Sequence, residues 1–160
     1  MNKNFWKGKK ILITGHTGFK GSWLVFWLNR LGAKITGISL PPSTNPNLYE
    51  LANIKSLCDD FICDIRDEKK LIKIFQDTQP EIVFHLAAQP LVRYSYSEPV
   101  ETFSTNIIGT TIVLECIRKT NSVKSSVIIT TDKVYKNNEW NNKIKHFIIL
   151  YQILYILNSA

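Results

Sequence analysis

The chain has 160 residues, of which 44% are hydrophobic and 21% are charged, with a formal net charge of +7. This composition is that of a globular domain, and no apolar segment is long enough for a secretory signal or for a membrane span of about 20 residues. Three cysteines without a C-x-x-C spacing argue against a disulfide framework and a zinc site, so we expect a cytoplasmic protein with no bound metal. The lysines are scattered along the chain, which argues against a nucleic-acid partner.

A glycine-rich turn between two apolar segments is the first pattern along the chain. Residues 9–14 are predicted to form a buried parallel strand, and segment 15–21 (GHTGFKG) leads from it into a helix predicted over residues 18–31. A strand, a glycine turn and a helix are the arrangement in which a dinucleotide pyrophosphate binds at a helix N-terminus. Three glycines alone would also fit a surface turn, so the flanking strand and helix carry this prediction.

Each glycine of this turn has its own expected role. Gly15 allows the chain to turn sharply at the strand end, Gly18 lets the backbone approach the phosphates, and Gly21 lets the helix pack closely. The order Lys20-Gly21-Ser22 excludes a P-loop, because that motif needs Gly-Lys-Ser/Thr after its four-residue spacer.

The predicted helix over residues 18–31 carries apolar side chains on nearly every side, which indicates deep packing, and Gly32 is expected to end it. A second strand is predicted over residues 34–40, and a proline-rich loop follows it. In a dinucleotide-binding unit, an acidic residue about 20 positions beyond the glycines holds the adenosine ribose. Pro41 occupies that position, so it does not decide between NAD and NADP.

The next elements are a third strand over residues 60–65, a helix over residues 69–78 that Asp67 is expected to cap, and a fourth strand over residues 82–86. Small residues follow the fourth strand and leave room for a ligand at the edge of the sheet. His85 stands inside the apolar run of this strand. We therefore expect a hydrogen-bonded core histidine, not a catalyst or a metal ligand.

The last elements are a loop over residues 91–99, a long helix over residues 99–120 and a fifth strand over residues 127–130. The loop is predicted to face a substrate or to be a plain surface turn. Strands that alternate with helices predict an α/β fold, a doubly wound parallel sheet in the order 3-2-1-4-5 with helices on both faces.

The glycine spacing G-x-x-G-x-x-G is typical of the extended short-chain dehydrogenase/reductases, and the string GHTGFKGSWL over residues 15–24 resembles the CDP-glucose 4,6-dehydratases. The string TTDKVY over residues 130–135, with Lys133 where related dehydratases have an acid, resembles the same family. The resemblance implies a Rossmann-type fold, NAD as cofactor, a CDP-glucose-like sugar nucleotide as substrate and a homodimer.

The same resemblance implies a set of cofactor-binding residues. It places the pyrophosphate over the glycine turn, adenine beside Asp64 and Ile65, and the nicotinamide ribose beside Ala87 and Ala88. The full set of expected cofactor-binding residues is Gly15, His16, Thr17, Gly18, Phe19, Gly21, Asp64, Ile65, Leu86, Ala87, Ala88, Gln89, Asn106 and Thr130.

The resemblance also implies the catalytic residues Thr131, Asp132 and Lys133, which follow the fifth strand. In this family the reaction converts CDP-glucose to CDP-4-keto-6-deoxyglucose. Thr131 would bind near O4, Asp132 would protonate the departing C6 hydroxyl, and Lys133 would assist removal of the C5 proton. The alternative interpretation of these residues is a turn with a solvated ion pair.

The resemblance runs to about residue 140 and ends there. We therefore expect an incomplete NAD-binding domain over residues 1–140 and a divergent tail over residues 141–160, which is a candidate for a frameshift, without a C-terminal substrate domain. No tyrosine has a lysine four positions later, so the Tyr-x-x-x-Lys pair of this superfamily is missing and an inactive fragment is expected. The alternatives are a non-catalytic NAD-binding remnant and another sugar-nucleotide epimerase or dehydratase.

Overall fold

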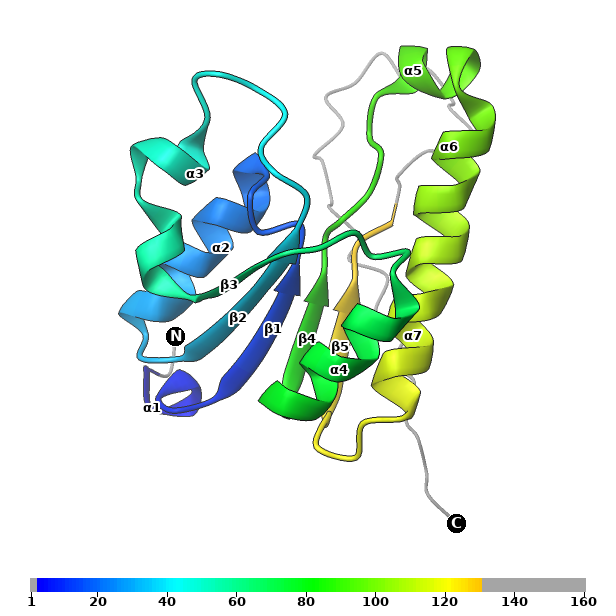
Figure 1. Ribbon diagram of the computed structural model, residues 1–160. Helices are drawn as coiled ribbons and strands as arrows, with labels where there is room; N and C mark the ends of the chain where they lie inside the picture. The colour runs from blue at the N-terminus through cyan, green and yellow to red at the C-terminus, as the bar shows by residue number, and fades with distance from the viewer. Residues whose placement is uncertain (1–2, 131–160) are drawn as a thin grey trace, which may run out of the picture.

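The computed structural model describes residues 3–130 of the chain. Its centre is a sheet of five parallel strands in the order β3-β2-β1-β4-β5 (Figure 1), which confirms the predicted fold class and strand order. The strands are β1 (Lys10–Thr14), β2 (Lys34–Ser39), β3 (Asp59–Ile62), β4 (Ile82–His85) and β5 (Ser125–Ile128).

The helices cover both faces of the sheet (Figure 1), because the side chains of each strand point alternately to one face and the other. Ile11 and Ile13 of β1 belong to the core beneath helix α2, whereas Leu12 belongs to the core beneath helices α4 and α7. The helical segments are α1 (Lys3–Trp6), α2 (Phe19–Arg30), α3 (Leu48–Leu51), the 3-10 turn η1 (Ile54–Leu57), α4 (Glu68–Thr78), α5 (Val92–Ser97), α6 (Pro99–Phe103), the π-helical segment η2 (Ser104–Gly109) and α7 (Thr110–Arg118).

The strand order reverses between β1 and β4. From β1 the chain passes by α2 to β2 on one side, and from β4 it passes by α7 to β5 on the other side. The loops that follow β1 and β4 therefore separate at the edge where the strands end, and in doubly wound folds ligands bind at this point. The glycine turn after β1 and the small residues after β4 both lie there.

Several local predictions agree with the structure. Gly32 has a φ of +84°, follows the C-cap residue Leu31 of α2 and ends that helix as expected. Asp67 caps α4, since its carboxylate accepts a hydrogen bond from the backbone N–H of Lys70 at 3.1 Å.

Other local predictions were wrong. The deep packing expected for α2 does not hold, because the side chains of Trp23 and Trp27 are 53% and 55% exposed. Segment 91–99 contains the short helix α5 instead of a loop. By contrast, the helix predicted over residues 99–120 does form, over residues 99–118, with the π-helical segment η2 at its centre. Strands β3 and β5 begin earlier than predicted and end at Ile62 and Ile128, because pairing with their neighbours sets their limits.

Candidate functional site

The glycine turn after β1 is built around close backbone contacts. Gly15 has a φ of +79°, and its N–H donates to the carbonyl of Ile38 at 2.7 Å. A Cβ atom on Gly15 would lie 2.8 Å from the backbone nitrogen of Ala87, and one on Gly21 would collide with the carbonyl of Gly15. Any side chain at these two positions would push apart β4, the turn and helix α2.

Gly18 differs from Gly15 and Gly21, because it is exposed and a side chain at this position would meet few atoms of the fold. A Cβ atom there would have the carbonyl oxygen of Gly15 at 3.3 Å as its only neighbour within 4 Å among the described residues. No side chain in the described part of the chain caps the N-terminus of α2 at Gly18. Free N–H groups and the helix dipole at this terminus favour an anion, and the bare backbone lets it come close, so this turn fits a dinucleotide pyrophosphate.

The side chains of His16 and Thr17 point into the protein, so only their backbone is available to a ligand. Nε2 of His16 lies 2.6 Å from Oδ1 of Asp60, whose other oxygen accepts a hydrogen bond from the hydroxyl of Tyr49 at 2.9 Å. The hydroxyl of Thr17 donates to the carbonyl of Leu40 at 2.8 Å. These buried contacts fix the turn to β3 and to the end of β2, whereas Phe19 is exposed at the start of α2.

His85 is 2% exposed and has a partner at each ring nitrogen, as expected of a core histidine. The hydroxyl oxygen of Thr14 accepts from the backbone N–H groups of Leu86 and Ala87, both at 3.2 Å, so its own hydrogen points to Nδ1 of His85 at 2.6 Å. Nε2 then carries the proton and donates to Thr110 at 2.9 Å. Burial lowers the pKa of His85 to about 4, so the ring is neutral at pH 7.

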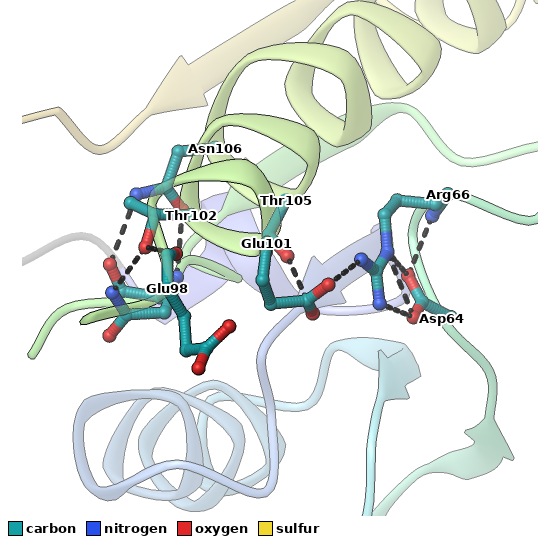
Figure 2. Close-up of polar contacts among 8 residues, drawn as sticks. Asp64, Arg66, Glu98, Glu101, Thr102, Thr105 and Asn106 are labelled. Carbon is teal, nitrogen blue, oxygen red and sulfur yellow. Dashed lines mark hydrogen bonds and ion pairs between the residues drawn. The ribbon is translucent and has the colours of Figure 1, made fainter. Parts of the chain in front are cut away.

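The loop after β4 is fastened to η2 through an amide side chain (Figure 2). Asn106 accepts a hydrogen bond from the backbone N–H of Gln89 at 2.7 Å and donates to the carbonyl of Gln89 at 3.0 Å. The side chain of Gln89 donates to the hydroxyl of Thr102 at 3.0 Å. These contacts hold the small residues Ala87 and Ala88 at the edge of the sheet, and Ala88 is exposed there.

The loop after β3 carries a network of charged side chains (Figure 2). The carboxylate of Asp64 accepts from the backbone N–H, Nε and Nη2 of Arg66 at distances of 2.6–3.1 Å, and Nη1 of Arg66 donates to Glu101 of α6 at 2.7 Å. The Arg66 hydrogen bonds hold the pKa of Asp64 below its usual value, and the two carboxylates raise the pKa of Arg66. Asp64 therefore stays ionised at the edge of the sheet.

Ile65 lies between the charged residues and the core. Its side chain is 4% exposed and faces Gly109 of η2, where an added Cβ atom would lie 2.6 Å from Cδ1 of Ile65. Little of Ile65 is available to a ligand, and its contact with the adenine ring stays a prediction.

Four predicted site residues follow β5, and three of them lie outside the described residues. Thr130 is exposed beyond the end of β5, and Thr131, Asp132 and Lys133 lie outside the part that the structure describes. Within residues 3–130 no three acidic, histidine or cysteine side chains are arranged to hold a metal ion. In the same range no helix has the length and hydropathy needed to cross a membrane.

The structure adds Asp60, Arg66 and Glu101 to the site residues that the sequence predicts. Arg66 stands only two positions after Asp64, so an Asp-x-Arg pattern at a strand end was a visible signal for that pair. Nothing in the sequence pointed to Glu101, which is 35 positions from Arg66.

Comparison with known proteins identifies relatives for nearly the whole described region. CDP-glucose 4,6-dehydratase of Salmonella typhimurium is 50% identical over 140 residues, which are 88% of this chain and 39% of that enzyme. The chain thus spans about two fifths of the length of this relative.

Two solved structures share the fold. UDP-glucose 4-epimerase of Thermotoga maritima with UDP-glucose is 34% identical, with a TM-score of 0.67 over 76% of this chain and 37% of that one. UDP-glucose 4-epimerase of Thermus thermophilus in complex with NAD is 28% identical, with a TM-score of 0.62 over 70% of this chain and 34% of that one. The family model described as GDP-mannose 4,6 dehydratase matches residues 12–143. The chain belongs to the GDP-mannose 4,6 dehydratase family of NAD-dependent epimerases and dehydratases.

Proposed function

We propose that this chain is the NAD-binding part of a nucleotide-sugar 4,6-dehydratase that acts on CDP-glucose. The open backbone at Gly18, at the point where the strand order reverses, is the observation that carries the proposal. The similarity to a CDP-glucose 4,6-dehydratase supports the substrate, and the epimerase solved with NAD supports the cofactor.

The proposed site has two halves on either side of the glycine turn. The pyrophosphate would lie over Gly18 and the N-terminus of α2, and adenine would lie beside the ionised Asp64. The nicotinamide ribose would lie beside Ala87 and Ala88, where small side chains leave room. Bound NAD supplies a hydride acceptor for the oxidation of a sugar carbon.

The proposed catalytic residues follow β5 in the sequence, three to five positions after its last residue, Ile128. Thr131 would bind the sugar near O4, Asp132 would protonate the departing hydroxyl, and Lys133 would assist removal of the C5 proton. The end of β5 supports this assignment, because Ile128 pairs with His85 at the edge where the glycine turn also lies. The chain spans 39% of the Salmonella typhimurium relative and contains no tyrosine with a lysine four positions later, so the 160 residues by themselves are expected to bind NAD without turnover.

A titration of the chain with NAD by calorimetry tests the cofactor site. Gly18→Val should abolish binding, because its side chain would fill the space that the phosphates need, while its Cβ atom would meet, among the described residues, only the carbonyl oxygen of Gly15, at 3.3 Å, which a small shift can relieve. Asn121→Val, in the exposed turn before β5 at the opposite edge of the sheet, is the control and should bind NAD normally. Unchanged NAD affinity in a folded Gly18→Val protein would contradict the placement.

A sugar-nucleotide epimerase is the second candidate, because the Thermotoga maritima UDP-glucose 4-epimerase is 34% identical. The two activities differ in the mass of their products: a dehydratase removes one water from CDP-glucose, and an epimerase leaves the mass unchanged. The whole protein incubated with CDP-glucose and UDP-glucose, followed by mass spectrometry, separates them.

The proposal includes a homodimer formed through the helix that runs from α6 to α7. Apolar side chains are exposed along this helix, namely Val100, Phe103, Ile107, Ile108 and Leu114. Light scattering of the purified protein tests this, and Phe103→Glu should give a monomer because it would bury a charge.

We also propose a cytoplasmic location without a nucleic-acid or membrane partner. The cysteines Cys58, Cys63 and Cys116 are free thiols, and burial raises the pKa of each of them. Such inert, reduced thiols are typical of the reducing cytoplasm. Cell fractionation of a tagged whole protein tests the location.

A further inference from the structure

We infer that Glu101 is a positioning residue for the adenine half of the proposed NAD site, and that it acts through Arg66 on Asp64. This inference rests on the proposed function. Glu101 belongs to α6 and lies 37 positions beyond Asp64 in the sequence, yet the two carboxylates share one guanidinium (Figure 2).

The first step of the argument concerns the acceptor sites of Asp64. An ionised carboxylate offers about four lone-pair sites. Three N–H groups of Arg66 occupy Asp64: the backbone N–H at 2.8 Å, Nε at 3.0 and 3.1 Å to the two oxygens, and Nη2 at 2.6 Å. The Nε–H is shared between the two oxygens, so three donors are spread over about four sites, and the carboxylate is 29% exposed, which leaves room for one more donor. A single N–H donor, such as one from the adenine amino group, fits there.

The second step concerns what holds Arg66. Its guanidinium is planar and its N–H groups point in fixed directions, so the orientation of the plane decides which lone pairs of Asp64 are filled. Nη1 donates to Oε2 of Glu101 at 2.7 Å, and Oε1 of Glu101 is 3.5 Å from the hydroxyl of Thr105. Glu101 thus fixes the plane of the guanidinium from the side opposite to Asp64.

The third step concerns the support behind these residues. Ile65 packs against Gly109 of η2, so the loop after β3 contacts the same continuous helix at an apolar point as well as a charged one. The apolar contact holds the loop in place without Glu101. Loss of Glu101 should therefore leave the loop bound to the helix and change only how Arg66 fills the acceptor sites of Asp64.

The experiment compares NAD with deamino-NAD, in which hypoxanthine replaces adenine and the exocyclic amino group becomes a carbonyl. Calorimetry gives the ratio of the two dissociation constants, which reports the contact with the amino group and not general stability. The unaltered chain should prefer NAD by at least about tenfold, as expected for a hydrogen bond to a charged acceptor. Glu101→Gln should reduce the ratio to about twofold.

Two further variants sharpen the result. Arg66→Lys keeps the charge but loses the planar arrangement of donors, so it should reduce the ratio as Glu101→Gln does. Glu98→Gln is the matched control, because it removes the same charge one turn earlier in the chain and no ion pair among the described residues involves Glu98. It should leave the ratio of the two dissociation constants unchanged. The side chain of Glu101 is 44% exposed, so the substitution should not unfold the chain.

The outcomes are distinguishable. A ratio that stays at tenfold in Glu101→Gln, or that falls equally in Glu98→Gln, would overturn the inference and leave the proposed function intact. A chain that binds NAD without any preference over deamino-NAD would also overturn it. Failure of the unaltered chain to bind NAD would overturn the proposed function, and the inference with it.

Discussion

The loops after β3 and β4 are both fastened to the helix that begins at α6, but by different chemistry (Figure 2). The loop after β4 is held by neutral groups, because the amide of Asn106 joins the backbone of Gln89. At the end of β4 itself, a neutral His85 joins Thr14 to Thr110. The loop after β3 is held by charges, since Arg66 pairs with Asp64 and Glu101 at partly exposed positions.

This difference decides how each half of the site responds to its surroundings. At 0.1 M salt, the interactions between exposed charges weaken with a screening length of about 10 Å, and more salt shortens this length. Hydrogen bonds between neutral groups are little affected by salt. A buried neutral histidine resists protonation, whereas a paired carboxylate resists loss of its charge. The nicotinamide side should therefore be sensitive to mild acid, and the adenine side to salt and to stronger acid.

The largest expected effect is the loss of stability in mild acid that His85 causes. Its pKa is about 4 in the folded chain because of burial, against an ordinary value of 6.5. Between these values the unfolded chain binds a proton that the folded chain does not, so the free energy of unfolding decreases as the pH falls from 6.5 to 4. The decrease between pH 7 and 4.5 should be about 2.5 kcal/mol.

Urea unfolding at the two pH values measures this decrease. His85→Gln is the comparison, because its amide keeps hydrogen-bonding capacity and does not titrate. The variant should be less stable at pH 7 and should lose much less stability on acidification. An equal decrease in both proteins would show that another group is responsible.

Asn106→Ala should have the second-largest effect. The substitution removes two hydrogen bonds and leaves the N–H and the carbonyl of Gln89 without their partner. The expected loss is about 2 kcal/mol of unfolding free energy. The loss should be the same in 0.05 M and about 0.5 M NaCl, since no charge is involved.

The matched control for this prediction is Thr111→Ala in the adjacent turn, whose hydroxyl bonds only to the carbonyl of Ile107. It should cost well under 1 kcal/mol, because Thr111 is exposed and the carbonyl of Ile107 also accepts a hydrogen bond from the backbone N–H of Thr110. A strong salt dependence of the Asn106→Ala effect would contradict the distinction between the two loops.

The fold was predictable because its signals are local. The apolar run of β1, the glycine turn and α2 are contiguous, and the alternation of strands and helices indicates a parallel sheet. The limits of β3 and β5 depend on pairing with strands that are distant in the sequence, so they were placed too late. The exposure of Trp23 and Trp27 was missed because an apolar side chain does not reveal what covers it.

The site residues also divide into those that local sequence signals predict and those that depend on contacts between distant residues. A positive φ or a close backbone contact depends on a single residue, so the structural roles of Gly15 and Gly21 could be assigned from the sequence, whereas the role of Gly18 toward a phosphate stays a prediction. The direction of the His16 side chain depends on Asp60, which is 44 positions away, and the sequence does not show that pairing. The role of Glu101 was invisible for the same reason, because its contact with Arg66 exists only in the folded chain.

The smallest expected effect is that of Arg66→Gln, and it tests the charged loop directly. The substitution leaves Asp64 and Glu101 without their shared cation, and it should cost about 1 kcal/mol at low salt because these groups are partly exposed. The cost should fall by about half in about 0.5 M NaCl, where charges are screened beyond a few ångströms.

Arg66 also holds the pKa of Asp64 below its ordinary value of 3.8, so the ionised pair stabilises the fold above that pH. That stabilisation is lost as the pH falls through the lowered pKa, below about pH 4. Urea unfolding of both proteins in both salts, and between pH 5 and about 2.5, measures the two responses. The variant should lack the part of the acid response that Asp64 contributes, and a cost that is independent of both salt and pH would show that Arg66 acts by packing alone.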